Sequence, residues 1–250
     1  MSVARAEFTK FRSVSSTAWS LLSAAILIVS FGILYAMVRV TRPPADPAGF
    51  DSVGVSLAGV QVAQLAVGVL GVLVITNEYS SGLIRTTFAA VPRRTPVFWG
   101  KAVVLAAAIF TLGLPAVFSA FLTGQSVLSA EHLDTSLGEP GVVRAVVGGA
   151  LYLVVVALFG LGLGAIIRHT AGGVAAVIAL LLGPQMVTGF LPTELADDIY
   201  RWLPSPAGLA ITTARPDSTL LSPWTGFAVF LLYAAAVLAL GAWRLRRRDA

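Results

Sequence analysis

The sequence predicts an all-α, polytopic membrane protein with six transmembrane helices. Three observations support this fold class. Of the 250 residues 57% are hydrophobic and only 12% are charged, which is about half the charged fraction of a soluble domain. The mean hydropathy is +0.86. Apolar runs longer than roughly 18 residues, which are typical of membrane spans, recur along the whole chain. We therefore expect one transmembrane domain over residues 1–250, with no large soluble domain.

The six apolar runs are separated by polar segments, of which residues 191–222 are a long one. The spans are expected at about residues 17–38, 57–76, 97–123, 143–167, 171–190 and 223–243. The first run is too long for the apolar core of a signal peptide, and no small-residue cleavage site follows it, so it should remain as an anchor. In the polar segment before the last span, residues 191–203 can form a short helix at the outer interface, where Trp and Tyr are favoured.

An amphipathic segment precedes the first span. In residues 3–14 the side chains of Phe8 and Phe11 share one side of a helical wheel, with Arg5 and Arg12 opposite. This pattern predicts an N-terminal interfacial helix. Glu7 falls within the apolar arc, and a frayed polar tail is the alternative.

The charges are divided unevenly between the two sides of the membrane. The N-terminal tail, the segment from Asn77 to Lys101, the turn at 168–170 and the C-terminal tail hold 12 Lys/Arg and 3 Asp/Glu. The other side holds 5 Lys/Arg and 9 Asp/Glu, giving +9 against −4. Because Lys and Arg concentrate in cytoplasmic loops, we expect both termini to lie in the cytoplasm. The protein itself is expected in the cell membrane, that is, the inner or plasma membrane. The same bias explains the net charge of +5 without a nucleic-acid partner.

Residues suited to catalysis or metal binding are scarce. Cysteine is absent, and the two histidines, His132 and His169, are separated by a span. This excludes disulfides, thiolate metal sites and a cysteine nucleophile, and it disfavours a metal centre or an intramembrane enzyme. Polar side chains within the spans are Gln61, Gln64 and Gln185. They can join helices by hydrogen bonds or line a substrate path.

Two segments imitate nucleotide-binding motifs. Gly160 to Ala165 matches G-x-G-x-x-A, but it lies inside a predicted span and no acidic residue follows at the required distance. Close helix packing through Gly160 and Gly164 is the better interpretation. Gly100-Lys101 lacks the remainder of a P-loop. We expect no cofactor in this chain; ATP and magnesium would belong to another subunit.

The segment from Asn77 to Lys101 is the longest polar interruption on the basic side. Within it Leu83, Phe88 and their apolar neighbours recur at helical spacing, and Pro92 ends the pattern. A short amphipathic cytoplasmic helix is one interpretation. An interfacial loop whose arginines meet anionic lipid headgroups is the other.

The chain resembles the permease subunits of ABC-2-type transporters. Residues Glu78 to Arg94 match E-Y-x-x-G-x-I-R-x-x-x-x-x-V-P-R-R, with Lys101 at the next span, and Glu7-Phe-Thr-Lys-Phe-Arg12 is similar to the usual opening of the family. The order of elements is also similar: an amphipathic N-terminal helix, six spans, a cytoplasmic helix between spans two and three, and short membrane-dipping helices before span six.

The resemblance implies one half of an exporter that works with a separate cytoplasmic ABC ATPase. A second permease copy would complete a homodimer or a related heterodimer, and a coupling helix within 78–91 would rest in a cleft of each ATPase. The implied ATPase-coupling residues are Glu78, Tyr79, Gly82, Leu83, Arg85, Phe88, Pro92 and Arg94. Arg168 and His169 would make a secondary cytoplasmic contact. A six-span interaction or immunity protein that transports nothing is the alternative function.

Overall fold

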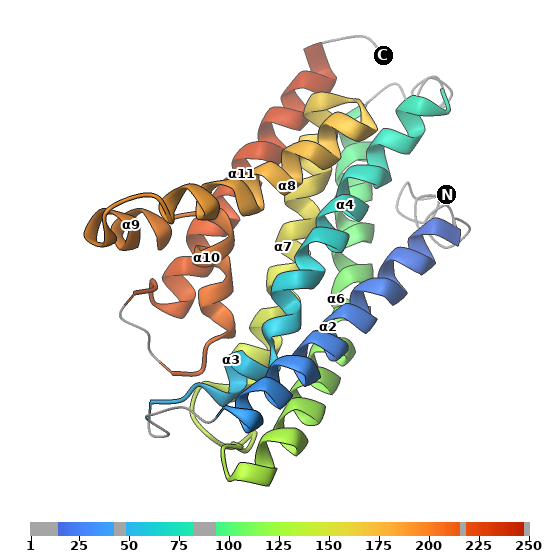
Figure 1. Ribbon diagram of the computed structural model, residues 1–250. Coiled ribbons are helices and arrows are strands. Elements are labelled where there is room, and N and C mark those ends of the chain that lie inside the picture. Colours follow the sequence, from blue (N-terminus) through green and yellow to red (C-terminus); the bar gives the residue numbers. More distant parts are fainter. Residues whose placement is uncertain (1–14, 43–48, 83–93, 216–218, 248–250) are drawn as a thin grey trace.

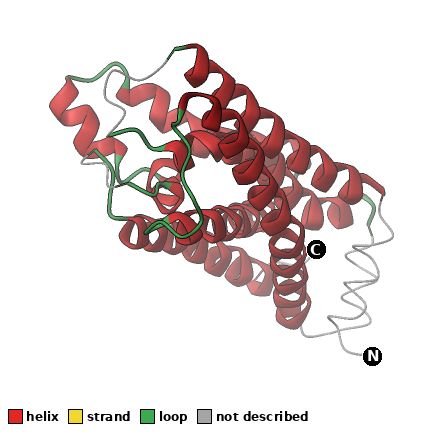
Figure 2. Ribbon diagram, turned by 90° about the horizontal axis from the view of Figure 1, so that it is seen from below, coloured by secondary structure: helices red, strands yellow, loops and turns green. Residues whose placement is uncertain are grey.

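Six long helices build the molecule, and they confirm the predicted fold class. The computed structural model describes residues 15–42, 49–82, 94–215 and 219–247, and this part of the chain consists of helices and connections without strands (Figures 1 and 2). Within these ranges six helices are long and apolar enough to cross a membrane. They are α2 (Ser15–Thr41), α4 (Ala58–Ser80), α6 (Arg94–Leu128), α7 (Val142–Ile167), α8 (Thr170–Thr188) and α11 (Pro223–Arg247).

The helices begin and end close to the predicted positions, but several extend beyond the apolar run. The 35 residues of α6 make a helix of about 52 Å, against a hydrocarbon thickness of about 30 Å. At one end of the bundle α2 begins and α11 ends (Figure 1); we call this the terminal end, and the other the opposite end. The N-terminal amphipathic helix predicted for residues 3–14 lies outside the described residues.

The described residues also form shorter helices: α3 (Ser52–Ser56), η1 (Ser129–Glu131), α9 (Thr193–Tyr200), α10 (Pro204–Leu209) and η2 (Ala210–Thr212). The α3 helix lies within residues 39–56, a segment whose Pro, Gly and Asp content predicts a loop. It forms because the Asp51 side chain caps its N-terminus by accepting from Gly54 N at 3.1 Å. Gln125 of α6 then holds it, donating from Nε2 to Ser52 O at 3.0 Å and to Ser56 Oγ at 2.9 Å.

The α7 helix is the centre of the bundle. In the most apolar 18-residue stretch of α7, 72% is buried, against 22% for α2 and 17% for α8. The reason is that α7 contacts α4, α6, α8 and α11. Small residues permit the close approach. A Cβ on Gly160 would overlap the carbonyl oxygen of Gly68 in α4, and one on Gly164 would meet Val72 O at 3.0 Å.

The segment between α8 and α11 enters the bundle. In Figure 1, α8 runs obliquely and reaches α9 about half-way between the two ends, and α10 then lies beside α11. The helix predicted within 191–203 forms as α9, whereas the following turn is not a surface loop. Ser205 and Gly208 are buried, and Gly208 lies against the rings of Tyr152 and Phe230, where a Cβ would come within 2.6 Å of Phe230.

Candidate functional site

The last turn of α4 carries the first predicted coupling residues. The hydroxyls of Ser80 and Ser81 donate to Asn77 O at 3.1 and 2.7 Å. Gly82 follows with φ +72°, the left-handed conformation with which glycine ends helices. Glu78 and Tyr79 therefore belong to α4, and the rest of the predicted coupling helix, residues 83–91, lies outside the described residues.

A buried ion pair joins α4 to α6. Lys101 Nζ donates to Glu78 Oε1 at 2.7 Å, and the two side chains are only 4% and 11% exposed. Glu78 lies in the last turn of α4, where the helix dipole disfavours a negative charge. Lys101 offsets that cost. As a partner of opposite charge it also offsets the larger cost of burying a lone carboxylate. The terminal ends of α4 and α6 are thus fixed to each other.

Arg168 extends this link to two further helices. It is the C-cap of α7 with φ +61°, and its guanidinium carbon lies 5.4 Å from the centre of the Tyr79 ring. Its Nη2 donates to Arg244 O near the end of α11 at 3.1 Å. We call Glu78, Tyr79, Lys101, Arg168 and the Arg244 carbonyl the polar network. Through it α4, α6, α7 and α11 are joined at the terminal end.

The predicted contact residues fall into three groups. Glu78, Tyr79 and Gly82 end α4 as described above, and Arg94 is the first residue of α6. The second group, Leu83, Arg85, Phe88 and Pro92, lies outside the described residues. Arg168 and His169 form the third. Arg168 points into the polar network, while His169 is exposed and caps α8 by accepting from Gly172 N at Nδ1, 3.3 Å away. Of these two residues only His169 is therefore exposed.

A second polar cluster lies among the helices. The hydroxyls of Tyr152 in α7 and Ser205 in α10 both donate to Gln64 Oε1 in α4, the latter at 3.0 Å. All three residues are buried. Gln64 Nε2 has no hydrogen-bond partner within the described ranges, which carries a cost of about 1–3 kcal/mol. This cluster fixes α10 to the bundle, but it provides no acceptor for the Gln64 Nε2 group.

The other two glutamines take no part in that cluster. Gln61 lies one turn earlier on α4 with its side chain exposed. Gln185 is half-buried and donates to Leu181 O of its own helix. The structure therefore does not bring Gln61, Gln64 and Gln185 together into one polar path.

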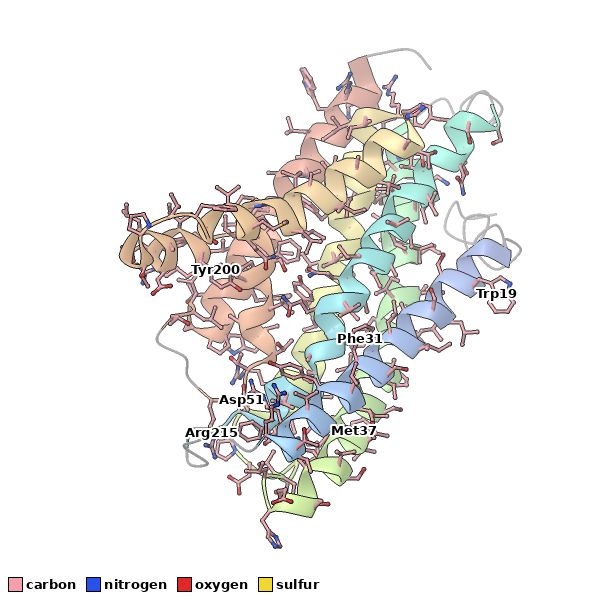
Figure 3. All side chains as sticks on the ribbon, viewed as in Figure 1. Trp19, Phe31, Met37, Asp51, Tyr200 and Arg215 are labelled. Carbon is pink, nitrogen blue, oxygen red and sulfur yellow. The ribbon has the colours of Figure 1, made fainter. Side chains whose placement is uncertain are left out.

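A charged group at the opposite end surrounds the cap of α3. Burial raises the pKa of the Asp51 carboxyl above its ordinary value of 3.8, and hydrogen bonds from backbone N–H groups, with the charge of Arg215, act against this more weakly. Figure 3 shows Asp51 and Arg215 at this end of the molecule. Arg144 Nη2 donates to Thr213 O at 3.0 Å, so α7 also holds the chain that leaves η2.

Sequence reasoning missed Lys101 as an ion-pair partner, together with Tyr152 and Ser205. Two of them had a usable signal. Tyr152 is the one hydroxyl side chain of α7, and Lys101 is a lone cation shortly after the start of an apolar run. Ser205 gave none, because Ser between two prolines is typical of a turn.

Comparison with known proteins adds no further assignment. No protein-family model matches the chain, and no protein of curated function is significantly similar to it.

Proposed function

We propose that the chain is the transmembrane permease subunit of an ATP-driven ABC exporter, in the cell membrane with both termini cytoplasmic. It forms the translocation path with a second permease copy, identical or related. Each copy is driven by a separate cytoplasmic ABC ATPase, which binds the ATP and magnesium.

The observation that carries this proposal is the buried ion pair between Glu78 and Lys101. These residues flank the segment 83–93, the predicted contact for the ATPase. A push on that segment reaches α4 and α6 together, because their ends are fixed by the pair. Tyr79 and Arg168 pass it on to α7 and α11. An interfacial loop that only meets lipid headgroups has no need of such a link.

The second permease copy is supported by the poorly covered α8. Only 17% of its most apolar stretch is buried, and Met186 and Phe190 are exposed. The helix leads directly to α9, where Arg201 and Asp198 form an exposed ion pair at 2.5 Å. Hydrocarbon alone does not stabilise such charges. This surface therefore fits a protein partner better than lipid.

The test is ATP hydrolysis by material purified with the tagged chain from its native membrane. Wild type is expected to carry an ATPase with a P-loop and to hydrolyse ATP. Arg85→Glu should lower the co-purified activity about 10-fold, the effect of losing one good charged contact at an interface. Arg246→Glu, a charge reversal at an exposed arginine of the same end, is the matched control and should keep the activity.

Two results would overturn the proposal. One is wild-type protein that carries no ATP hydrolysis after cross-linking in the membrane. The other is equal activity in Arg85→Glu and Arg246→Glu. If the cellular role of the chain survives inactivation of the ATPase P-loop, the non-transporting interaction or immunity protein becomes the better function.

A further inference from the structure

An open pocket of about 440 Å³ lies at the opposite end of the bundle, between the last turns of α2 and the start of α3. Its volume is within the range of small-ligand sites. Tyr35 and Arg39 of α2 form one wall, and Phe50, Asp51 and Val55 form the other. The pocket therefore places a cation opposite a carboxylate, with an aromatic side chain beside each.

The position along α2 sets the pocket at the height of lipid headgroups. Trp19 and Arg39 are 20 residues apart, or about 30 Å along a helix, which equals the hydrocarbon thickness. Trp19 is exposed near one end of α2, as expected for an interfacial anchor. Phe31 and Met37 lie on the exposed surface between them (Figure 3). A lipid whose acyl chains lie on that surface would have its headgroup next to the pocket.

The cation of the pocket is held in place but keeps donor capacity. Arg39 Nη2 donates to Tyr35 Oη at 3.2 Å, and the guanidinium carbon lies 5.2 Å from the centre of the Tyr35 ring. Its Nε is buried and has no acceptor among the residues that the structure describes. Arginine binds phosphate through such parallel N–H groups. A phosphate in the pocket would satisfy this donor.

The opposite wall suits a positively charged amine. Asp51 accepts from Gly54 N and is half-buried. The charge of Arg215, which does not line the pocket, offsets the cost of burying this carboxylate only weakly, so a cation within the pocket would stabilise it further. Phe50, which also lines the pocket, is an aromatic residue of the kind that attracts cations. Phosphate and ammonium on one short headgroup match the two walls.

We propose that this pocket binds the headgroup of a zwitterionic phospholipid of the phosphatidylethanolamine type, with its phosphate on Arg39 and its ammonium on Asp51. The site is separate from the polar network and does not depend on coupling to an ATPase. It would seat one lipid at the end of α2 and fix that helix against α3.

Native mass spectrometry of the purified full chain in detergent tests the site with three probes. Short-chain phosphatidylethanolamine should bind about 10-fold tighter than short-chain phosphatidylglycerol, which lacks the ammonium. Free phosphorylethanolamine, which lacks the acyl chains, should bind more weakly than the lipid. Equal binding of both lipids would overturn the role of Asp51, and tight binding of the free headgroup would overturn the assignment to a lipid.

Variants assign the two walls. Arg39→Gln should weaken both lipids about 10-fold, since each contains a phosphate, and Arg39→Lys should restore part of the loss. Asp51→Asn should remove the preference for phosphatidylethanolamine. Arg42→Gln removes an exposed arginine of the same end that does not line the pocket and should change neither. Equal binding by Arg39→Gln and Arg42→Gln would overturn the proposal. If Arg39→Gln fails to fold, as judged by tryptophan fluorescence, Asp51→Asn and the three probes on wild type still decide.

Discussion

Glu78 and Lys101 show how one pair of side chains can be costly alone and stabilising together. Each lies on an otherwise apolar helix, and each is nearly inaccessible to solvent. A buried charge that loses its partner is strongly destabilising, whereas the intact pair offsets most of its own desolvation. Stability at this position therefore depends on charge complementarity between two helices and much less on which residue carries which sign.

Removing one charge should therefore cost far more than exchanging both. Glu78→Gln is expected to lower the free energy of unfolding by about 3–5 kcal/mol, and the exchange Glu78→Lys with Lys101→Glu should recover most of it. Thermal unfolding in detergent measures both. The exposed pair of Asp198 and Arg201 is the control, since Asp198→Asn should cost at most about 1 kcal/mol. Equal losses at the two pairs would contradict the buried role of Glu78.

The raised pKa of Asp51 gives stability a pH dependence of definite sign. The folded chain holds a proton on this carboxyl more readily than the unfolded chain does. The residue therefore contributes more stability in acid, and this contribution is lost as the pH rises through the folded pKa. Asp51→Asn cannot ionise but can still cap α3. We therefore expect Asp51→Asn to be more stable, relative to wild type, at neutral pH than at about pH 4. An unchanging difference across this range would contradict the assignment.

At the scale of elements, glycine decides how closely helices meet. Gly160 brings α7 against α4, and Gly162 brings it against α11, where a Cβ would lie 2.9 Å from Leu238 N. Backbone blocks both positions, so a side chain cannot be accommodated by rotating a neighbour. The G-x-x-x-G spacing that predicts close packing thus corresponds to a real approach of α4 and α7.

Two alanine substitutions should differ in sign. Gly160→Ala is expected to cost about 1–3 kcal/mol, because α4 and α7 must separate. Gly183→Ala in α8 has no atom within 4 Å of the new Cβ and should be neutral or stabilising by about 0.5–1 kcal/mol, as alanine favours helix. Paired unfolding measurements decide this. A loss at Gly183 as large as that at Gly160 would show that helix packing is not the cause.

Local pattern predicted the long helices well, and it predicted contacts between distant residues poorly. The expected span over 143–167 agrees closely with α7, because an uninterrupted apolar run is a strong signal. The α4 helix continues past its expected end at 76 to Ser80, since polar residues lengthen a helix until Gly82 ends it. The link between Glu78 and Lys101 spans 23 residues, and no periodicity encodes such a pairing. The burial of Ser205 likewise depends on helices from elsewhere in the chain.

At the scale of the whole molecule, the six spans bring the polar network and the α3 pocket to opposite ends. The absence of cysteine in the sequence makes single-cysteine labelling direct. Ser81 at the end of α4 and Ser129 beyond the end of α6 are both exposed, and they lie at opposite ends of the bundle. They can therefore report the orientation that the charge bias predicts.

With both termini cytoplasmic, an impermeant maleimide should label Ser129→Cys in intact cells and leave Ser81→Cys unlabelled. Permeabilising the membrane should then expose Ser81→Cys to the reagent. The basis is the excess of Lys and Arg on the side of Ser81. The reverse pattern in intact cells would place the termini outside and would also rule out a cytoplasmic ATPase at the segment 83–93.

The central position of α7 bears on how the protein is made. Synthesis delivers α2, α4 and α6 to the membrane before α7, and α8 and α11 after it. When α7 leaves the ribosome, the face with Gly160 can dock at once, but the face with Gly162 must wait for α11. A chain truncated before Pro223 would leave that glycine face towards lipid and Ser205 without the cover of the last helix. Quality control in the cell should therefore recognise products that lack α11, even though they retain five of the six spans.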